Sequence, residues 1–386
     1  MELDREDELV LSGEFGDTAR MMMEMLVALG KVFGAERMVP IRSAQVSGAS
    51  YKTIGKYGLE WLNTLKARVA VPTVLNPVGM DRERWREMGI SPGFAKKQAE
   101  VINAYDRLGV RLECTCTPYY NSITQFGDHI AWSESSAVAY ANSVIGARTN
   151  REGGPGALAA AVIGKTPFYG LHIIGNRKPG LVFTVDGDAG QDTAWYGALG
   201  YLAGKEAGNR IPYFRGIRPG RDQMKALGAA MAASGAVALF HIEGITPDAR
   251  VFSYDTEHLE TIHIGQEAIR SVFSDIPVDA VAIGCPHCSQ DELSTAARLL
   301  RGKKVKIPVL IFTSGTVKTA SKGDVETIER SGARVFTDTC MVVSPCMDNF
   351  RAIMVNSGKA FAYVPNMCGA LARIGTIREC IDIATA

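Results

Sequence analysis

The sequence predicts an α/β protein in which parallel or mixed sheets are flanked by helices. From about residue 210 onward, apolar β-branched runs alternate with amphipathic helical patterns, a rhythm typical of βαβ units. Such runs are expected in parallel sheets, which helices cover on both faces. In the first half, apolar runs end in small polar loops, with helical patterns between them. Both halves are therefore expected to contain strands covered by helices.

The first half opens with a predicted helix. From about residue 19, apolar residues recur with the 3.6-residue period of one helical face: Met22, Met25, Leu26, Leu29, Val32 and Phe33. One strand is expected over 38–46 and is followed by the loop 47–50. Another is expected over 67–75 and is followed by Asn76 and Pro77. A helix is expected over 91–110. It leads into a third strand that ends at Cys116.

The stretch 119–156 is rich in Ser, Asn, Gly and aromatic residues, and a helix is expected over 135–146. In the second half, strands and helices alternate. Strands are predicted over 236–247, 278–284, 307–315, 333–338 and 352–358, with helices over 290–302 and 322–332. This order favours a parallel sheet.

The composition and the N-terminus exclude several classes of protein. A net charge of +1 provides no broad basic surface for nucleic acid. No apolar run reaches the roughly 20 residues of a membrane span. The acidic start MELDREDELV lacks a signal-peptide pattern, so a cytoplasmic location is expected. GxGxxG after a strand, HExxH and GxSxG are absent, and the sequence GKT at 164–166 lacks the glycine that a P-loop requires at Ala159.

Three cysteines carry the main functional prediction. Cys116, Cys285 and Cys340 each follow a predicted strand and lie in a polar loop. In open α/β sheets, ligands bind outside the carboxyl ends of the strands, so the three thiolates are expected at one crevice. Three thiolates suit an iron–sulfur cluster in which one iron has no protein ligand. That open iron is typical of a dehydratase rather than of an electron carrier.

Three alternative roles for the cysteines stay open. The CPHC motif at 285–288, between a strand and a helix, is also the pattern of a thiol–disulfide redox protein. A structural zinc site would need a second pair with suitable spacing, which Cys114 and Cys116, or Cys340 and Cys346, do not provide. All eight cysteines could also be buried thiols. Replacing Cys288 by Ser would distinguish the redox protein, which needs this thiol, from the lyase, which does not.

Polar loops offer groups that could hold an anionic substrate. Segment 129–136 contains His, Trp, Glu and three Ser residues at a predicted helix start, where backbone N–H groups bind anions. Arg148 and Arg151 lie in a glycine-rich loop and either bind a carboxylate or phosphate or form exposed ion pairs. Residues 356–359 follow a strand and predict a small anion nest with Lys359.

Four segments resemble the aconitase X family: CTPYYNSITQFGDHIAWSESSAVAYANSVIGARTNREGG, PFYGLHIIGNRKPG, GCPHCS and DTC. The likeness runs from LSGEFG near the start to NSGKAFAYVP near the end. It implies an aconitase-like multi-domain architecture, with a [4Fe–4S] cluster in the cleft between domains and the swivelling domain on a separate small subunit. Residues 1–210 would hold the first cluster cysteine and the substrate loops, and residues 211–386 the other two cysteines.

The resemblance also implies an activity and a set of site residues. The chain is similar to large subunits that dehydrate (R)-mevalonate 5-phosphate to trans-anhydromevalonate 5-phosphate, in a modified mevalonate route to isoprenoids. Cys116, Cys285 and Cys340 match the family's cluster ligands. Glu134, Ser135 and Lys359 are expected to be catalytic. Substrate contacts are expected at Gly48, Ala49, Ser50, Asn76, Pro77, Glu134, Ser135, Arg148, Arg151 and Lys359. At Ala49 the family would lead us to expect Val, a harmless change if the backbone makes the contact.

A second substrate stays open within the same family. Some members dehydrate cis-3-hydroxy-L-proline, and these usually carry the small domain fused in the same chain. A chain that ends at Ala386 after the large-subunit pattern favours the phosphorylated substrate. By analogy with aconitase, a serine on the swivelling domain acts as the base. The heterodimer, and not this chain alone, is then expected to be active.

Overall fold

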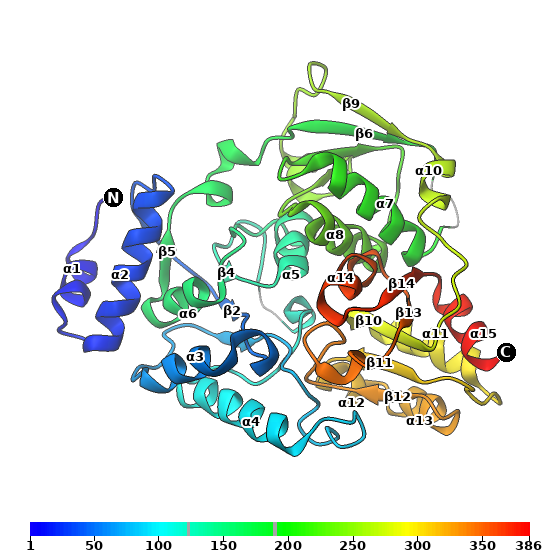
Figure 1. Ribbon diagram of the computed structural model, residues 1–386. Coiled ribbons are helices and arrows are strands. Elements are labelled where there is room, and N and C mark those ends of the chain that lie inside the picture. The colour runs from blue at the N-terminus through cyan, green and yellow to red at the C-terminus, as the bar shows by residue number, and fades with distance from the viewer. Residues whose placement is uncertain (122–123, 188–190) are drawn as a thin grey trace.

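The computed structural model describes residues 1–121, 124–187 and 191–386. Figure 1 shows three groups of elements, coloured blue to cyan, green, and yellow to red, that meet around three central helices: α5, α8 and α14. Among the described residues, three sheets are parallel and one small sheet is antiparallel. Helices flank the parallel sheets, which confirms the predicted α/β class.

The first group, residues 1–177, builds a small parallel sheet in the order β3-β2-β4. Its helices are α1 (Arg5–Ser12), α2 (Asp17–Val32), α3 (Tyr51–Thr64), α4 (Pro92–Arg107), α5 (Ser135–Tyr140) and α6 (Gly154–Ile163). Its strands are β1 (Met38–Pro40), β2 (Ala44–Val46), β3 (Thr73–Leu75), β4 (Ala131–Trp132) and β5 (Lys165–Pro167). Short helical turns are η1 (Pro118–Tyr120), η2 (Ala141–Ile145), η3 (Gly170–His172) and η4 (Ile174–Arg177).

Three strand predictions for this group need correction. The strand expected over 38–46 is two strands in different sheets, since β1 pairs with β5 and β2 pairs with β3 and β4. The run 67–75 forms a strand only at β3. The strand expected before Cys116 does not form. Arg111 makes an isolated bridge to Val74, and Cys114 then adopts a positive φ of 45°, which ends the extended pairing.

The second group, residues 178–276, forms a parallel sheet in the order β8-β7-β6-β9. Its strands are β6 (Leu181–Val185), β7 (Pro212–Arg215), β8 (His241–Ile242) and β9 (Thr261–Ile264). Its helices are α7 (Thr193–Ala207), α8 (Arg221–Gly235), α9 (Pro247–Val251) and α10 (Gln266–Arg270). The strand expected over 236–247 is thus reduced to the two residues of β8.

The third group, residues 277–386, forms a parallel sheet in the order β12-β11-β10-β13-β14. Its strands are β10 (Ala280–Cys288), β11 (Val309–Thr313), β12 (Arg334–Phe336), β13 (Ala352–Val355) and β14 (Leu371–Ile374). Its helices are α11 (Gln290–Leu300), α12 (Gly315–Ala320), α13 (Lys322–Arg330), η5 (Pro345–Met347), α14 (Gly358–Cys368) and α15 (Ile377–Thr385). Every residue of the central strand β10 is buried, as expected for a parallel strand covered on both faces.

Glycines allow the central helices to approach each other closely. A Cβ at Gly197 of α7 would lie 2.7 Å from the backbone N of Gly358, the first residue of α14. A Cβ at Gly358 itself would lie 2.8 Å from the Cβ of Ala230 in α8. The start of α14 is therefore fixed against α7, and this contact places Lys359, the next residue.

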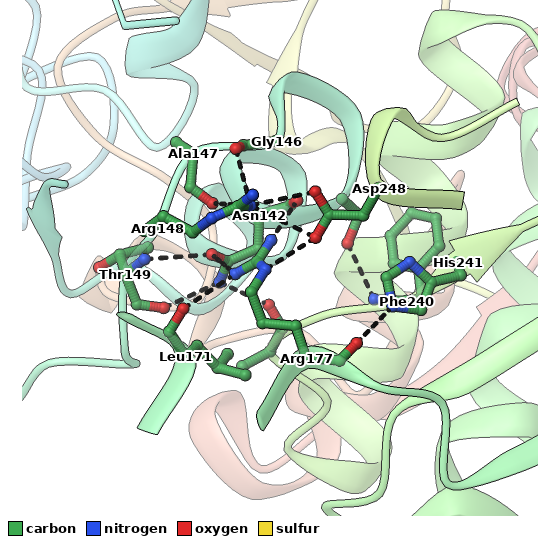
Figure 2. A network of polar contacts seen from close by, with 12 residues as sticks. Asn142, Gly146, Ala147, Arg148, Thr149, Leu171, Arg177, Phe240, His241 and Asp248 are labelled. Atoms are coloured by element: carbon green, nitrogen blue, oxygen red, sulfur yellow. Dashed lines mark hydrogen bonds and ion pairs between the residues drawn. The ribbon is translucent and has the colours of Figure 1, made fainter. Parts of the chain in front are cut away.

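A buried ionic network joins the first and second groups (Figure 2). Asp248 of α9 accepts hydrogen bonds from Nη1 of Arg148 at 3.1 Å and from Nε of Arg177 at 2.7 Å. Arg177 also donates to the side-chain oxygen of Asn142 at 3.0 Å and to its carbonyl oxygen at 3.0 Å. All four side chains are buried, so the contact between the two groups of elements contains charged side chains that are shielded from water.

No helix among the described residues combines the length and hydrophobicity required to cross a bilayer. The division of the chain into 1–210 and 211–386 stays a prediction.

Candidate active site

A cavity of about 480 Å³ opens between the first and third groups of elements. It collects most of the residues that the sequence analysis selected. They are Gly48, Asn76, Pro77, Cys116, Glu134, Ser135, Arg151, Cys285, Cys340 and Lys359. The chain order separates these residues widely, and the fold brings them together at one surface.

One wall of the cavity is built from the carboxyl ends of three parallel strands. β2, β3 and β4 end before Ser47, Asn76 and Ser133, and their parallel pairing places these ends on one edge. Ser133 Oγ accepts from the backbone N of Ser47 at 2.6 Å and donates to the carbonyl of Gln45 at 2.7 Å, which ties two of the loops together. Gly48 has a φ of 80°, a conformation that suits glycine at this turn.

A buried ion pair lies on the same wall. Lys359 Nζ donates to Glu134 Oε1 and, at 3.1 Å, to Ser136 Oγ. Asn76 Nδ2 donates to the other carboxylate oxygen of Glu134 at 2.8 Å. Burial would raise the pKa of Glu134, but the charge and hydrogen bond of Lys359 lower it to about 2. Burial lowers the pKa of Lys359, but attraction to Glu134 outweighs this and leaves it raised, so both groups are charged.

Three buried thiols also line the cavity. Cys116 belongs to the loop after Arg111, Cys285 lies within β10, and Cys340 follows β12. The proximity of the Cys285 and Cys340 thiols raises the pKa of Cys285 and lowers that of Cys340. Burial raises the pKa of Cys116 to about 12, and the nearby ammonium of Lys359 opposes this rise. The cation thus favours negative charge on all three sulfurs.

The location of Cys285 differs in one respect from the sequence expectation. It lies inside β10 rather than in a loop after a strand, because the strand continues through an irregularity between Ile283 and Cys288. Gly284, with a φ of 102°, turns the chain at this point. A side chain at Gly284 would clash with the carbonyl of Phe312, so glycine is required for the thiol to reach the cavity.

The second cysteine of the CPHC motif is separated from the cavity. Cys288 packs in the hydrophobic cluster with Val281 and Leu293, whereas Cys285 packs in the cluster with Phe312 and Met341. Burial raises the pKa of Cys288 well above its ordinary value. A thiol–disulfide exchange site requires an accessible thiolate, so this geometry does not support the redox alternative.

The donor set fits an iron–sulfur cluster better than a single metal ion. Within residues 1–121, 124–187 and 191–386, no three His, Cys, Asp or Glu side chains converge closely enough to hold one ion. In an iron–sulfur cluster each thiolate binds a different iron, so the thiols can lie farther apart than the ligands of a single metal ion. Three buried thiols on one cavity meet this requirement. Thr339, the residue before Cys340, has a buried hydroxyl without a hydrogen-bond partner among the described residues.

Three of the selected residues do not line the cavity. Ser50 caps α3 and donates to the carbonyl of Val343 at 2.7 Å, and the carbonyl of Ala49 accepts from Gln98 at 2.8 Å. Ala49 and Ser50 therefore fix the loop 47–50 through hydrogen bonds on the side away from the cavity. Arg148 points into the network around Asp248, as Figure 2 shows, and neither contacts the cavity nor forms an exposed ion pair.

The cavity also includes residues that the sequence analysis missed. Tyr363 lies one helical turn after Lys359, and the Lys359 ammonium is 5.8 Å from the centre of its ring. The i, i+4 spacing along α14 would have identified it. Ile54, Val343 and Met367 add apolar surface, but no motif in the sequence marks these three residues.

Comparisons with known proteins give a consistent picture. Models of the aconitase X first, second and third domains match residues 1–174, 179–274 and 278–386. The large subunit of phosphomevalonate dehydratase from Methanosarcina mazei is 52% identical, over 100% of this chain and 97% of that protein. The cis-3-hydroxy-L-proline dehydratase of Pseudomonas aeruginosa is 33% identical, over 99% of this chain and 70% of that protein.

A solved structure agrees with these sequence matches. The crystal structure of Thermococcus kodakaraensis aconitase X in its holo-form superimposes with a TM-score of 0.92 at 44% sequence identity, and the match covers 100% of both chains. The matched models cover nearly the whole chain, and the match to the Methanosarcina mazei subunit extends over nearly the full length of both proteins. This chain therefore belongs to the aconitase X family.

Proposed function

We propose that this protein is the large, catalytic subunit of a hydro-lyase that dehydrates (R)-mevalonate 5-phosphate to trans-anhydromevalonate 5-phosphate. The reaction would serve a modified mevalonate route to isoprenoids. The observation that carries the proposal is the single cavity that holds three buried thiols, the Glu134–Lys359 ion pair and Arg151. Large subunits of phosphomevalonate dehydratases from three archaea are 45–52% identical to this chain, over at least 95% of its length.

Cys116, Cys285 and Cys340 would hold a [4Fe–4S] cluster. When bound, it supplies a Lewis-acidic iron that assists the departure of the substrate hydroxyl. Burial of the thiols keeps competing water away from them. The ammonium of Lys359 offsets part of the cost of three buried negative sulfurs.

The remaining residues would bind and orient an anionic substrate. Lys359 is held by Glu134 and Ser136, so its ammonium presents a fixed positive charge to the cavity. Arg151 is exposed at the cavity and is the cation best placed to receive the phosphate, because a guanidinium binds phosphate through two parallel hydrogen bonds. Arg148 has no such role, because it is buried in the network around Asp248 and does not line the cavity.

Dehydration requires a base for the proton on the carbon next to the hydroxyl-bearing carbon. Glu134 is a poor candidate, because its pKa of about 2 makes it a weak base and Lys359 occupies one of its oxygens. Ser135 lines the cavity and accounts for one polar contact to the substrate. By analogy with aconitase, the base would lie on a swivelling domain carried by a small partner subunit.

The experiment is anaerobic co-expression with a candidate small subunit, followed by analysis of bound iron and sulfide and an assay for loss of mevalonate 5-phosphate. We expect a brown heterodimer that releases the anhydro product. The variants Cys116→Ser, Cys285→Ser and Cys340→Ser should lose both cluster and turnover. The matched variant Cys380→Ser, which changes a buried thiol of α15 that packs in the core, should keep both.

Two results would contradict the proposal. A heterodimer without iron or sulfide under anaerobic conditions would remove the cluster, and with it the role of the three thiols. A heterodimer that contains the cluster but dehydrates cis-3-hydroxy-L-proline and not mevalonate 5-phosphate would leave the reaction class intact and replace the substrate.

A further inference from the structure

His287 lies behind the cavity and is fully buried, between Cys285 and Cys288 of β10. Both of its ring nitrogens have partners. Nε2 is 2.8 Å from the carbonyl oxygen of Thr339, and Nδ1 is 3.1 Å from the hydroxyl of Thr115. A carbonyl only accepts hydrogen bonds, so Nε2 carries a proton. A neutral imidazole protonated at Nε2 accepts at Nδ1, here from the Thr115 hydroxyl, so the ring bridges the two segments.

The partners of His287 have a common feature in the sequence. Thr115 immediately precedes Cys116, Thr339 immediately precedes Cys340, and His287 itself lies two residues after Cys285. The backbone N–H of His287 also donates to the sulfur of Cys116 at 3.2 Å. One side chain and its own amide thus connect the three segments that carry the thiols of the cavity, although the chain separates these segments widely.

His287 is itself held from neighbouring elements. Lys225 of α8 donates to the carbonyl of His287 at 3.4 Å, and Lys225 is paired with Glu292, which caps α11. On the other side, the hydroxyl of Thr115 accepts from the backbone N of Thr117 at 3.1 Å. The imidazole is therefore a fixed part of a polar network and not a mobile side chain.

We propose that His287 is a positioning residue for the iron–sulfur cluster. It sets the separation of the three cysteine segments before the cluster is loaded, and its amide hydrogen bond moderates the charge on the Cys116 sulfur. Residues that orient metal ligands through hydrogen bonds typically contribute about 10- to 100-fold in metal affinity or activity. Hydrogen bonds to the sulfurs also set cluster potential. The inference rests on the proposed function, because it presupposes a cluster on these thiols.

The test uses the anaerobically reconstituted heterodimer and follows the decay of cluster absorbance after addition of an iron chelator. His287→Leu should lose the cluster about 10- to 100-fold faster than wild type. His287→Gln keeps a donor for the Thr339 carbonyl and should be intermediate. Thr115→Val removes the hydroxyl that His287 accepts from and should also accelerate loss, whereas Thr115→Ser retains it and should behave as wild type. His263→Gln, at an exposed position of β9, is the control.

The reduction potential of the remaining cluster separates positioning from a general loss of stability. His287→Leu keeps the backbone N–H that donates to the Cys116 sulfur, but it loses the ring contacts to Thr339 and Thr115 that hold this amide in place. The amide should then move away from the sulfur, and the potential should become more negative than that of wild type. A purely structural defect would lower the unfolding temperature of the cluster-free chain but leave this potential unchanged.

Each outcome bears on one of the two proposals. A wild-type heterodimer that takes up no iron or sulfide refutes the proposed function itself. A wild type that binds the cluster, together with a folded His287→Leu variant of equal decay rate and equal potential, refutes the role of His287. If His287→Leu does not fold, the variants Thr115→Val and Thr115→Ser decide the question. Equal rates of cluster decay in the two variants overturn the proposal, and faster decay in Thr115→Val supports it.

Discussion

Asp248→Asn is the most direct test of the network that joins the first and second groups of elements. Asp248 is the acidic partner that Arg148 and Arg177 share, and the structure buries all three side chains (Figure 2). Asparagine keeps the shape of aspartate but removes its charge. Two guanidinium groups would then remain in the interior without a carboxylate at their shared contact, and this is the costly way to break a buried ion pair.

The expected loss of stability follows from the geometry. Removal of one partner from a buried pair costs about 3–5 kcal/mol. The entropy of unfolding is about 2.1 cal/mol/K per residue near the midpoint. If all 386 residues unfold together, this corresponds to a fall of about 4–6 °C in Tm. If only the part matched by the second domain model, residues 179–274, unfolds separately, the fall is about 15–25 °C.

Calorimetry of the purified chain distinguishes these cases, because the number and area of the transitions report the unfolding unit. The control is Asp382→Asn, which breaks an exposed pair with Lys303 at 3.2 Å and should cost at most about 1 kcal/mol. This lowers Tm by about 1 °C if the whole chain unfolds together, and by about 4 °C if the part matched by the third domain model, residues 278–386, unfolds separately. If Asp248→Asn melts together with this control, the network contributes no net stability and the reasoning is refuted.

Three further predictions concern the cavity and its surroundings. Burial raises the pKa of Glu152 from its ordinary value of 4.5 to about 7, so the stability of the wild type should fall as the pH rises from 4.5 to 7. Glu152→Gln should then raise Tm at pH 8 but not at pH 4, and parallel pH profiles of Tm for variant and wild type would contradict this. Gly197→Ala should push the start of α14 away and reduce kcat/KM of the heterodimer, whereas Gly175→Ala, in open space, should not; equal rates would show that α14 adjusts freely. Lys359→Met should lower kcat/KM for the phosphorylated substrate by about 10- to 100-fold, and kinetics equal to wild type would exclude substrate binding by Lys359.

Local patterns predicted the helices better than the strands. α2 forms where the apolar periodicity predicted a helix, although Val32 and Phe33 at the end of the predicted stripe are exposed. Ser91 before Pro92 marks the start of α4 in the sequence. The run 38–46 gave no sign that it divides between two sheets, because strand pairing depends on partners elsewhere in the chain. The same limit explains why the strand predicted before Cys116 does not form: the backbone there makes only one isolated bridge, from Arg111 to Val74.

In the candidate site too, local sequence identified some residues, whereas contacts between residues far apart in the chain could not be predicted. Cys285 and Cys340 could be selected because each thiol follows an apolar run, and the structure brings both to one cavity. Arg148 was selected for its loop composition, yet Asp248, far along the chain, determines its environment. His287 drew notice only as part of CPHC, because its contacts to Thr115 and Thr339 exist only after folding.

The division of the thiols between distant parts of the chain has a consequence for biosynthesis. Cys116 leaves the ribosome long before Cys340, and Lys359 follows later still. A polypeptide truncated before Cys340 has neither the complete thiol set nor the lysine whose charge favours the thiolates. Any cofactor that requires all three sulfurs therefore cannot be fully bound until synthesis has passed Cys340.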